Sequence, residues 1–262
     1  MKNWITKRAF SLLFTFCNEE LSAFYFDIRK DALYCDPLGA PRRLAARTVM
    51  DLIFNRLVIW FAPLLPFTME EVWLSRFPSD DGSVHLQTFP DTPESWRNDA
   101  LAEDWEWIKM LRRASTFDLE RARTLSKDPD YDSMETIGSS LEAVQTFYVH
   151  KSEFKDAVER LADTEPDEFL ADVFIVNKVI LKVIPKAEFF DELGDPKFPL
   201  LKQTSPKGEK IDIGFETEKV DSKLIKCARS WKYFDPASAD PAYPDITPRD
   251  AAAVRAWDAA HG

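Results

Sequence analysis

Four side chains near the end of the sequence have the spacing of a structural zinc site. Cys227 and Ser230 stand three residues apart, sixteen residues follow, and Thr247 and Asp250 again stand three apart. A zinc site of this kind has two C-x2-C pairs separated by roughly fifteen to twenty residues, so that four thiolates surround the metal. Here only Cys227 is a cysteine, and hydroxyl oxygens are far weaker zinc ligands than thiolates. We therefore expect no metal ligands here, which leaves a ruined metal site, a chance spacing, or a surface that works without its metal.

A segment of this kind must be held together by something other than a metal. Five aromatic side chains could form a cluster in it: Trp231, Tyr233, Phe234, Tyr243 and Trp257. Prolines in the same stretch lower the entropy of the unfolded chain. We expect the segment either to pack around these aromatic rings or to be partly disordered.

The patterns that accompany catalysis or phosphate binding are missing from the sequence. Its seven glycines form neither a G-x-G-x-x-G nor a G-K-[ST] loop. The three histidines, His85, His150 and His261, lie apart from the cysteines and from any G-x-S-x-G turn, so no catalytic triad is visible. Adjacent carboxylates such as Glu19 and Glu20 diverge by about 100° on a helix. The residues alone predict no catalytic residue and no cofactor.

Composition and charge limit the class of protein. Hydrophobic residues make up 45% and charged residues 30% of the 262 residues, as in soluble globular proteins of two or so domains. Three separated cysteines and a start without an apolar signal core predict a cytoplasmic protein. A net charge of −11 argues against a nucleic-acid partner, but residues 1–60 hold nine basic and six acidic side chains. Local patches must therefore decide what the chain binds.

The periodicity of apolar residues predicts an α+β fold that is mostly α. Residues 1–100 read as helices with one apolar face each, which is typical of a helical bundle, and 101–125 as another helix. Val, Ile and aromatic residues at 141–149 and 172–184 predict strands on either side of a short helix. The proline-rich stretch 185–210 reads as a loop, 210–217 and 222–231 as a hairpin, and 249–260 as a helix.

Four motifs in order resemble the isoleucyl-tRNA synthetase family of class I aminoacyl-tRNA synthetases. They are "LSAFYFDIRKDALYCD" (21–36), "APLLPFTMEEVW" (62–73), "IGSSLEA" (137–143) and "FLADVFIV" (169–176). The stretches "KCARSWK" and "DITPRD" resemble the remnant of the four-cysteine zinc knuckle that ends such chains. The resemblance implies an anticodon-binding helical bundle over 1–100, a helical and small α/β junction over 101–184, and a loop with a degenerate, metal-less knuckle-like tail over 185–262.

The same resemblance implies a fragment of a larger enzyme. The family's nucleotide-binding catalytic domain and its editing domain have no counterpart in this sequence. The parent enzyme would be an isoleucine--tRNA ligase that charges tRNA(Ile) with isoleucine using ATP. This fragment would bind the anticodon stem and loop without a catalytic site or a cofactor of its own.

The resemblance also implies residues that contact tRNA. In the family, an Arg between the first two knuckle cysteines and a Trp just after them reach the anticodon, and these positions are Arg229 and Trp231 here. Trp231 has an alternative role as a core residue, and Lys232 and Lys226 touch either phosphate or solvent. Arg43 and Arg47, four apart on one helical face, would either line the anticodon stem or pair with Asp51 and other carboxylates.

Two other classes of function compete with this interpretation. A free-standing helical module derived from such an enzyme would bind another protein, and an acidic pI of about 4.9 suits a basic partner surface. The third class is a self-contained enzyme, and no group of residues in the sequence supports it.

Overall fold

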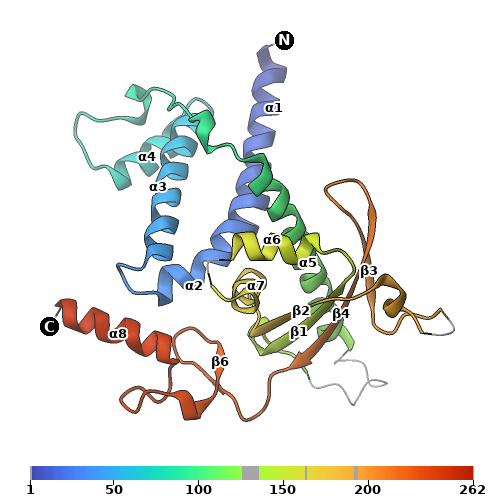
Figure 1. Ribbon diagram of the computed structural model, residues 1–262. Helices are drawn as coiled ribbons and strands as arrows, with labels where there is room; N and C mark the ends of the chain where they lie inside the picture. Colours follow the sequence, from blue (N-terminus) through green and yellow to red (C-terminus); the bar gives the residue numbers. More distant parts are fainter. Residues whose placement is uncertain (1, 126–135, 163, 192–193, 262) are drawn as a thin grey trace. The chain divides into compact units, whose positions relative to one another are not determined.

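The computed structural model describes residues 2–125, 136–162, 164–191 and 194–261 (Figure 1). The described chain forms two compact units. One contains Met1–Asp31 and Asp99–Ala252, and the other contains Ala32–Asn98 and Ala253–Gly262. The fold is α+β and mostly α, as predicted. The unit boundaries differ from the predicted ranges 1–100, 101–184 and 185–262, and each unit is described by itself below.

The first unit begins with a continuous helical rod. It consists of α1 (Lys2–Thr15), the π-helical segment η1 (Phe16–Phe26) and the first residues, to Asp31, of α2 (Asp27–Cys35). A π-helix has more residues per turn than an α-helix. Apolar residues three or four apart, which share one face of an α-helix, therefore do not stay on a single buried face through η1. Leu21 is buried and Phe24 packs against the core, whereas Phe14 remains 55% exposed.

The centre of the first unit is a four-stranded sheet covered on one face by three helices. Helices α5 (Asp99–Leu125) and α7 (Pro166–Phe174) pack on the sheet, and α6 (Glu153–Leu161) packs on both of these helices. The strand order is β2-β1-β4-β3, with β1 (Ala143–Val149) parallel to β2 (Lys178–Val183). Strand β4 (Lys210–Lys219) pairs antiparallel with both β1 and β3 (Leu200–Thr204). Helices α6 and α7 form the crossover that parallel pairing of β1 and β2 requires.

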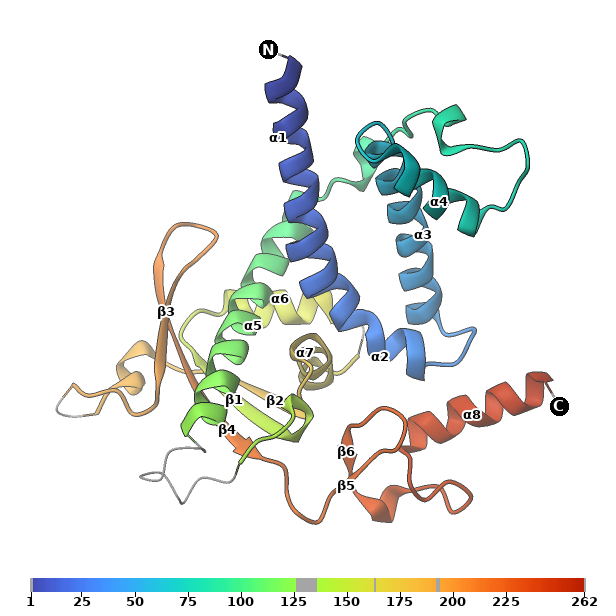
Figure 2. The same ribbon diagram turned by 180° about the vertical axis from the view of Figure 1, so that it is seen from behind.

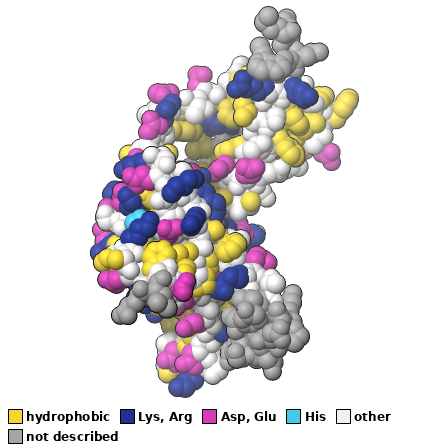
Figure 3. Space-filling view, turned by 90° about the vertical axis from the view of Figure 1, so that its right-hand side faces the viewer, with side chains coloured by type: hydrophobic (Ala, Val, Ile, Leu, Met, Phe, Trp, Pro, Cys, Tyr) yellow, Lys and Arg dark blue, Asp and Glu magenta, His cyan; other side chains and the backbone are white. Residues whose placement is uncertain are grey.

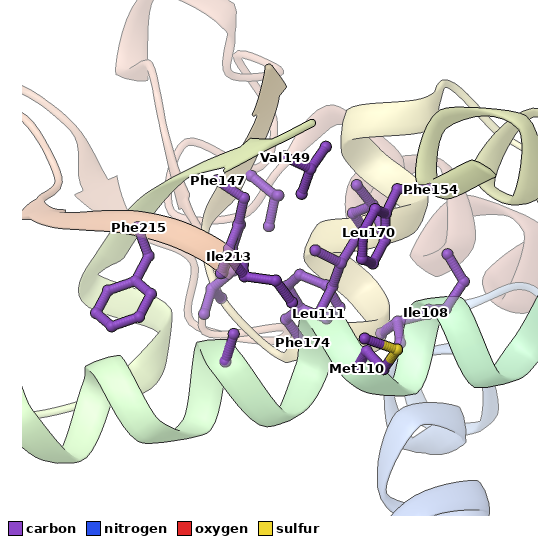
Figure 4. Close-up of a cluster of buried hydrophobic side chains, with 14 of the residues drawn as sticks. Ile108, Met110, Leu111, Phe147, Val149, Phe154, Leu170, Phe174, Ile213 and Phe215 are labelled. Atoms are coloured by element: carbon purple, nitrogen blue, oxygen red, sulfur yellow. The ribbon is translucent and has the colours of Figure 1, made fainter. Parts of the chain in front are cut away.

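The core lies between α5, the crossover helices and one face of this sheet. Alternate residues of β1 are buried, which is the pattern of a strand with one covered face. Figure 4 shows Phe147 of β1 and Ile213 of β4 pointing toward Leu111 of α5, with Phe154 and Leu170 beside them. The predicted strand at 141–149, the helix at 101–125 and the short helix between the two predicted strands are confirmed within a few residues.

The predictions for 172–231 are partly wrong. Helix α7 continues to Phe174, so the strand begins only at Lys178. The stretch 185–210, predicted as a loop, contains β3, a five-residue strand that lies between Pro199 and Pro206. These prolines do not prevent the strand, because proline is tolerated at strand ends. Strand β4 therefore pairs with β3 and β1 rather than with 222–231. The predicted boundary at 184 separates β2 from β4, although both belong to one sheet.

The rest of the first unit is a small irregular region. Strands β5 (Ile225–Lys226) and β6 (Tyr233–Phe234) pair antiparallel, and a loop leads from them to α8 (Pro248–His261). Figures 1 and 2 both show this two-stranded ribbon beside the beginning of α8. The predicted helix at 249–260 is confirmed.

The second unit is built on two helices. Helix α3 (Pro41–Phe61) packs on α4 (Pro66–Arg76) around Val58, Ile59, Ala62 and Val84. Helix α4 begins at Pro66 because proline fits the first turn of a helix, where its missing N–H is not needed. Arg56 closes the following loop: its guanidinium donates to the Asp91 carbonyl at 2.8 Å and lies 4.7 Å from the centroid of the Trp96 ring.

A buried polar cluster joins α5 to the sheet. The fully buried Asp118 accepts hydrogen bonds from Arg121 on the same helix and from the Thr217 hydroxyl on β4. The Gln145 amide of β1 donates to Thr217 Oγ1 at 2.9 Å and accepts from Ser115 Oγ at 2.5 Å. Removing one member therefore leaves buried donors without acceptors, which is costly.

We predict that Asp118→Ala lowers the free energy of unfolding by roughly 2–4 kcal/mol, because Arg121 and Thr217 lose their shared acceptor. Glu120→Ala on the same helix removes an exposed ion pair with Arg123 and should cost at most about 1 kcal/mol. Urea unfolding followed by circular dichroism measures both variants. Equal midpoints for the two would contradict the assignment of the buried cluster as a stabilising link.

Candidate nucleic-acid interface

The four side chains with the spacing of a zinc site meet in the structure. The Asp250 carboxylate oxygen Oδ2 accepts a hydrogen bond from Ser230 Oγ at 2.6 Å and from Thr247 Oγ1 at 2.8 Å. The Cys227 thiol donates to the same oxygen at 3.1 Å. Three donors thus converge on one carboxylate oxygen, and we call these four residues the Asp250 cluster.

Burial and hydrogen bonding act in opposite directions on the charge of Asp250. Its side chain is fully buried, and loss of solvation favours the neutral acid. The donors from Ser230, Cys227 and Thr247, together with the positive charge of Arg249, outweigh this effect and hold the pKa of Asp250 below its usual value. The carboxylate is therefore ionised and fully hydrogen-bonded at neutral pH.

The donor set of the Asp250 cluster does not fit a structural zinc site. Such a site needs four ligands that bind zinc strongly, usually thiolates and imidazoles. The cluster offers one thiol, one carboxylate and two hydroxyls. Within the described ranges, no group of three or more His, Cys, Asp or Glu side chains is placed to hold a metal ion.

The cluster lies beneath a tight turn that carries two of the predicted tRNA-binding residues. The Cys227 N–H donates to the Lys232 carbonyl at 2.8 Å, and the Trp231 N–H donates to the Cys227 carbonyl at 3.1 Å. Trp231 has a left-handed φ of 64°, a conformation that is unfavourable for a bulky residue. Strained backbone of this kind persists only where the surrounding structure fixes it, and it is frequent at functional sites.

The indole of Trp231 points into solvent. Its residue is 60% exposed, and the Lys226 ammonium lies 5.2 Å from the ring centroid. The alternative role of Trp231 as a core residue is therefore wrong. Trp257 is also 50% exposed and stacks on His261, so neither tryptophan contributes to a buried aromatic cluster. The Asp250 cluster is a buried group of contacts in this segment.

The other two predicted residues of the turn, Arg229 and Lys232, both bind groups of the same unit. Arg229 is half-buried, and its guanidinium donates to the Asp250 carbonyl at 3.2 Å. The Lys232 ammonium lies 2.5 Å from Asp172 of α7, and both side chains are largely buried. Lys232 therefore lies in an ion pair inside the unit rather than in solvent.

Three further contacts hold this turn against the rest of the first unit. The Tyr233 N–H donates to Asn177 Oδ1 at 2.7 Å, and the Tyr233 hydroxyl lies 3.4 Å from Glu142. Arg249 makes a two-point ion pair with Asp31 of α2, with its shorter N–O distance at 2.5 Å. No local pattern in the sequence marks these partners, because 56 to 218 residues separate them from the turn.

Arg43 and Arg47 lie in the second unit, on α3. Arg43 is half-buried and donates to the Asp36 carbonyl at 3.0 Å, while Arg47 is exposed. Asp51, the carboxylate considered as their partner, lies 3.3 Å from Arg76 instead. Arg47 is therefore more accessible to an external phosphate than Arg43.

Charge on the surface is mixed rather than uniform. Lys and Arg side chains lie among Asp and Glu side chains on the face shown in Figure 3. No helix in the described part of the chain is long and apolar enough to cross a membrane.

Comparisons with known proteins agree with the resemblance seen in the motifs. Residues 1–122 match the family described as the anticodon-binding domain of tRNA ligase. The chain is 40% identical to an isoleucine--tRNA ligase of Brucella abortus over 95% of its length, and 39% identical to that of Bartonella henselae over 95%. It is 40% identical to that of Bradyrhizobium diazoefficiens over 97% of its length.

The chain spans about 22% of the length of each of these curated relatives. The matched family and the identity along nearly the whole chain lead to the same conclusion. The chain is similar to part of isoleucine--tRNA ligases over nearly its whole length, and its residues 1–122 match the anticodon-binding domain of tRNA ligase.

Proposed function

We propose that this chain binds the anticodon stem and loop of an isoleucine tRNA, as one part of a longer isoleucine--tRNA ligase in the cytoplasm. The observation that carries the proposal is Trp231, an exposed indole on a turn whose backbone is fixed by hydrogen bonds. In the full enzyme, other domains activate isoleucine with ATP, transfer it to the tRNA and edit the product. We assign no catalytic residue and no cofactor to this chain.

Trp231 suits recognition of a single-stranded base. Unpaired bases of an RNA loop are accessible and stack on aromatic side chains. Trp231 is 60% exposed, and the Lys226 ammonium, 5.2 Å from the ring centroid, adds a positive charge that suits a negatively charged RNA backbone. Because the turn is already ordered, little entropy is lost when the base binds.

We assign different roles to Arg229 and Lys232. Arg229 extends from the same turn, two positions before Trp231, and a guanidinium there suits contact with a base edge or a phosphate. Lys232 supports the turn from within through Asp172, and its contribution to RNA binding is indirect.

Arg47 is our candidate for contact with the RNA backbone in the second unit. Its exposed guanidinium on α3 suits sequence-independent attraction to the stem phosphates. Arg43, one turn earlier, binds the carbonyl of Asp36 at the end of α2. We therefore assign Arg43 chiefly to the local structure of that helix connection.

Exposed apolar side chains on the first helical rod fit a partner within the same enzyme. Leu12, Phe14 and Phe16 are 63%, 55% and 40% exposed, respectively. The relatives are more than four times as long as this chain. We propose that other parts of the enzyme, including further helices of the anticodon-binding bundle, cover this surface.

We predict that Trp231→Ala weakens binding of an RNA hairpin with the anticodon stem and loop of isoleucine tRNA by about 1–3 kcal/mol, because one base loses its stacking partner. Trp257→Ala removes an indole of similar exposure that stacks on His261 and should leave the affinity unchanged. Fluorescence anisotropy with labelled hairpin measures both. Equal affinities for the two variants would show that Trp231 is not the stacking residue.

We predict that Arg47→Ala weakens binding by a similar factor for hairpins of any loop sequence, because a phosphate contact is blind to sequence. The slope of log affinity against log salt should fall in magnitude by roughly 0.7–0.9, since one phosphate contact releases about that many counterions. Affinity titrations between low and moderate salt measure the slope. An unchanged slope would place Arg47 outside the interface.

We predict that the purified chain does not catalyse isoleucine-dependent exchange of pyrophosphate into ATP. Binding of ATP and isoleucine is assigned above to other domains of the enzyme. The assay is compared with a blank lacking isoleucine and with a full-length isoleucine--tRNA ligase as positive control. Exchange above the blank would mean that this chain contains a catalytic site.

A further inference from the structure

We infer that the carboxylate of Asp250 takes the place of a metal ion as the centre that shapes the turn carrying Arg229 and Trp231, which makes Asp250 a positioning residue for RNA recognition. The consequence for RNA binding rests on the proposed function, whereas the organisation of the turn does not. The inference begins from one geometric fact. Three side chains from two separate segments, Cys227, Ser230 and Thr247, all donate to one oxygen of Asp250.

A helix cap alone explains only part of this arrangement. Thr247 precedes α8, and its hydroxyl accepts a hydrogen bond from the Asp250 N–H at 3.1 Å, as an N-cap residue does. Capping leaves the donors from Ser230 and Cys227 unexplained, because these residues lie 20 and 23 positions earlier in the sequence. Asp250 therefore links the turn to the helix, as the shared metal of a C-x2-C…C-x2-C site links its two halves.

The Asp250 cluster is linked to Trp231 and Arg229 by hydrogen bonds and by direct neighbours in the chain. Ser230, whose hydroxyl is 2.6 Å from Asp250 Oδ2, directly precedes Trp231 at its left-handed φ. The Ser230 N–H also donates to the Cys227 sulfur at 3.4 Å. The Arg229 guanidinium is bound to the Asp250 carbonyl. Asp250 thus binds Cys227 and Ser230, which lie two residues before and one residue after Arg229, as well as the Arg229 side chain itself.

The cluster is also anchored to the rest of the first unit. Arg249, next to Asp250, approaches its other oxygen Oδ1 at 3.3 Å and forms the ion pair with Asp31 of α2. Lys232, on the far side of the turn, is paired with Asp172 of α7. A buried carboxylate with hydrogen-bond donors and a neighbouring cation has the partners that compensate for its burial, so the site is stable without a metal.

The first experiment compares Asp250→Ala with Asp245→Ala, an exposed aspartate of the same loop, in the whole 262-residue chain. Hydrogen exchange of the amides of Cys227 and Trp231 reports the turn directly, because both close it through backbone hydrogen bonds. We expect Asp250→Ala to abolish their protection while amides of β1 and β4 stay protected, and Asp245→Ala to match the wild type. Retained protection at the turn in Asp250→Ala overturns the inference.

The second experiment measures binding of the same anticodon hairpin in a double-mutant cycle. Asp250→Ala should weaken affinity at least as much as Trp231→Ala, roughly tenfold or more. In a chain that already has Trp231→Ala, Asp250→Ala should reduce the affinity much less than it does in the wild type, because Asp250 acts partly through Trp231. Full additivity would mean that Asp250 does not position Trp231. If the wild type does not bind the hairpin, the proposed function fails, while the exchange result still decides the role of Asp250.

The third experiment restores the metal ligands. Elemental analysis should find less than about one tenth of a zinc ion per wild-type chain. A chelator should leave the structure of the wild-type chain unchanged. The triple variant Ser230→Cys, Thr247→Cys and Asp250→Cys, together with Cys227, should take up about one zinc per chain, because the four side chains already meet. It should also recover protection of the Trp231 amide when zinc is present. Stoichiometric zinc in the wild type, or none in the triple variant, contradicts the proposed exchange of metal for carboxylate.

Discussion

The buried carboxylate of Asp250 is the interaction on which the proposed RNA-binding turn depends. An ionised group without solvent is tolerated only when its hydrogen-bonding capacity is satisfied, and Cys227, Ser230 and Thr247 satisfy one of its oxygens together. The same contacts draw a loop and a helix start into one compact site. A turn with a tryptophan in the left-handed region is therefore retained without a large apolar core beneath it.

The remainder of the first unit gives this site a rigid support. The helices α5, α6 and α7 and the sheet share one continuous core, and the buried polar cluster around Asp118 ties α5 to β1 and β4. The turn is attached to this body by side chains of α2, α7 and the α7–β2 connection. Ile175 in that connection and Trp231 are the non-glycine residues of the described chain with left-handed φ. The strained positions therefore lie where the turn and the core are joined.

Local patterns in the sequence predicted most of the helices and β1, because periodicity and caps depend on near neighbours. The Ser139 hydroxyl, for example, caps the short helical turn at 140–142 as its spacing with Glu142 indicates. The pairing of β4 with β3 was missed, since strand partners are chosen by long-range packing. The zinc-like spacing singled out Cys227, Ser230, Thr247 and Asp250 without predicting that they meet, and it gave no sign of Asp250 as their shared acceptor. Composition contains no signal that the Asp250 carboxylate, among these four side chains, becomes buried and ionised, and the partners Asp31 and Asp172 are distant in sequence.

The central claim is that a metal-free turn presents Trp231 to an unpaired base. The most direct measurement uses an isoleucine anticodon hairpin with 2-aminopurine substituted in turn at each loop position, because stacking on an indole quenches its fluorescence. The account predicts quenching at one loop position on binding of the wild type, unchanged by EDTA and lost in Trp231→Ala. Quenching that persists in Trp231→Ala, or that disappears when EDTA is added, would contradict it.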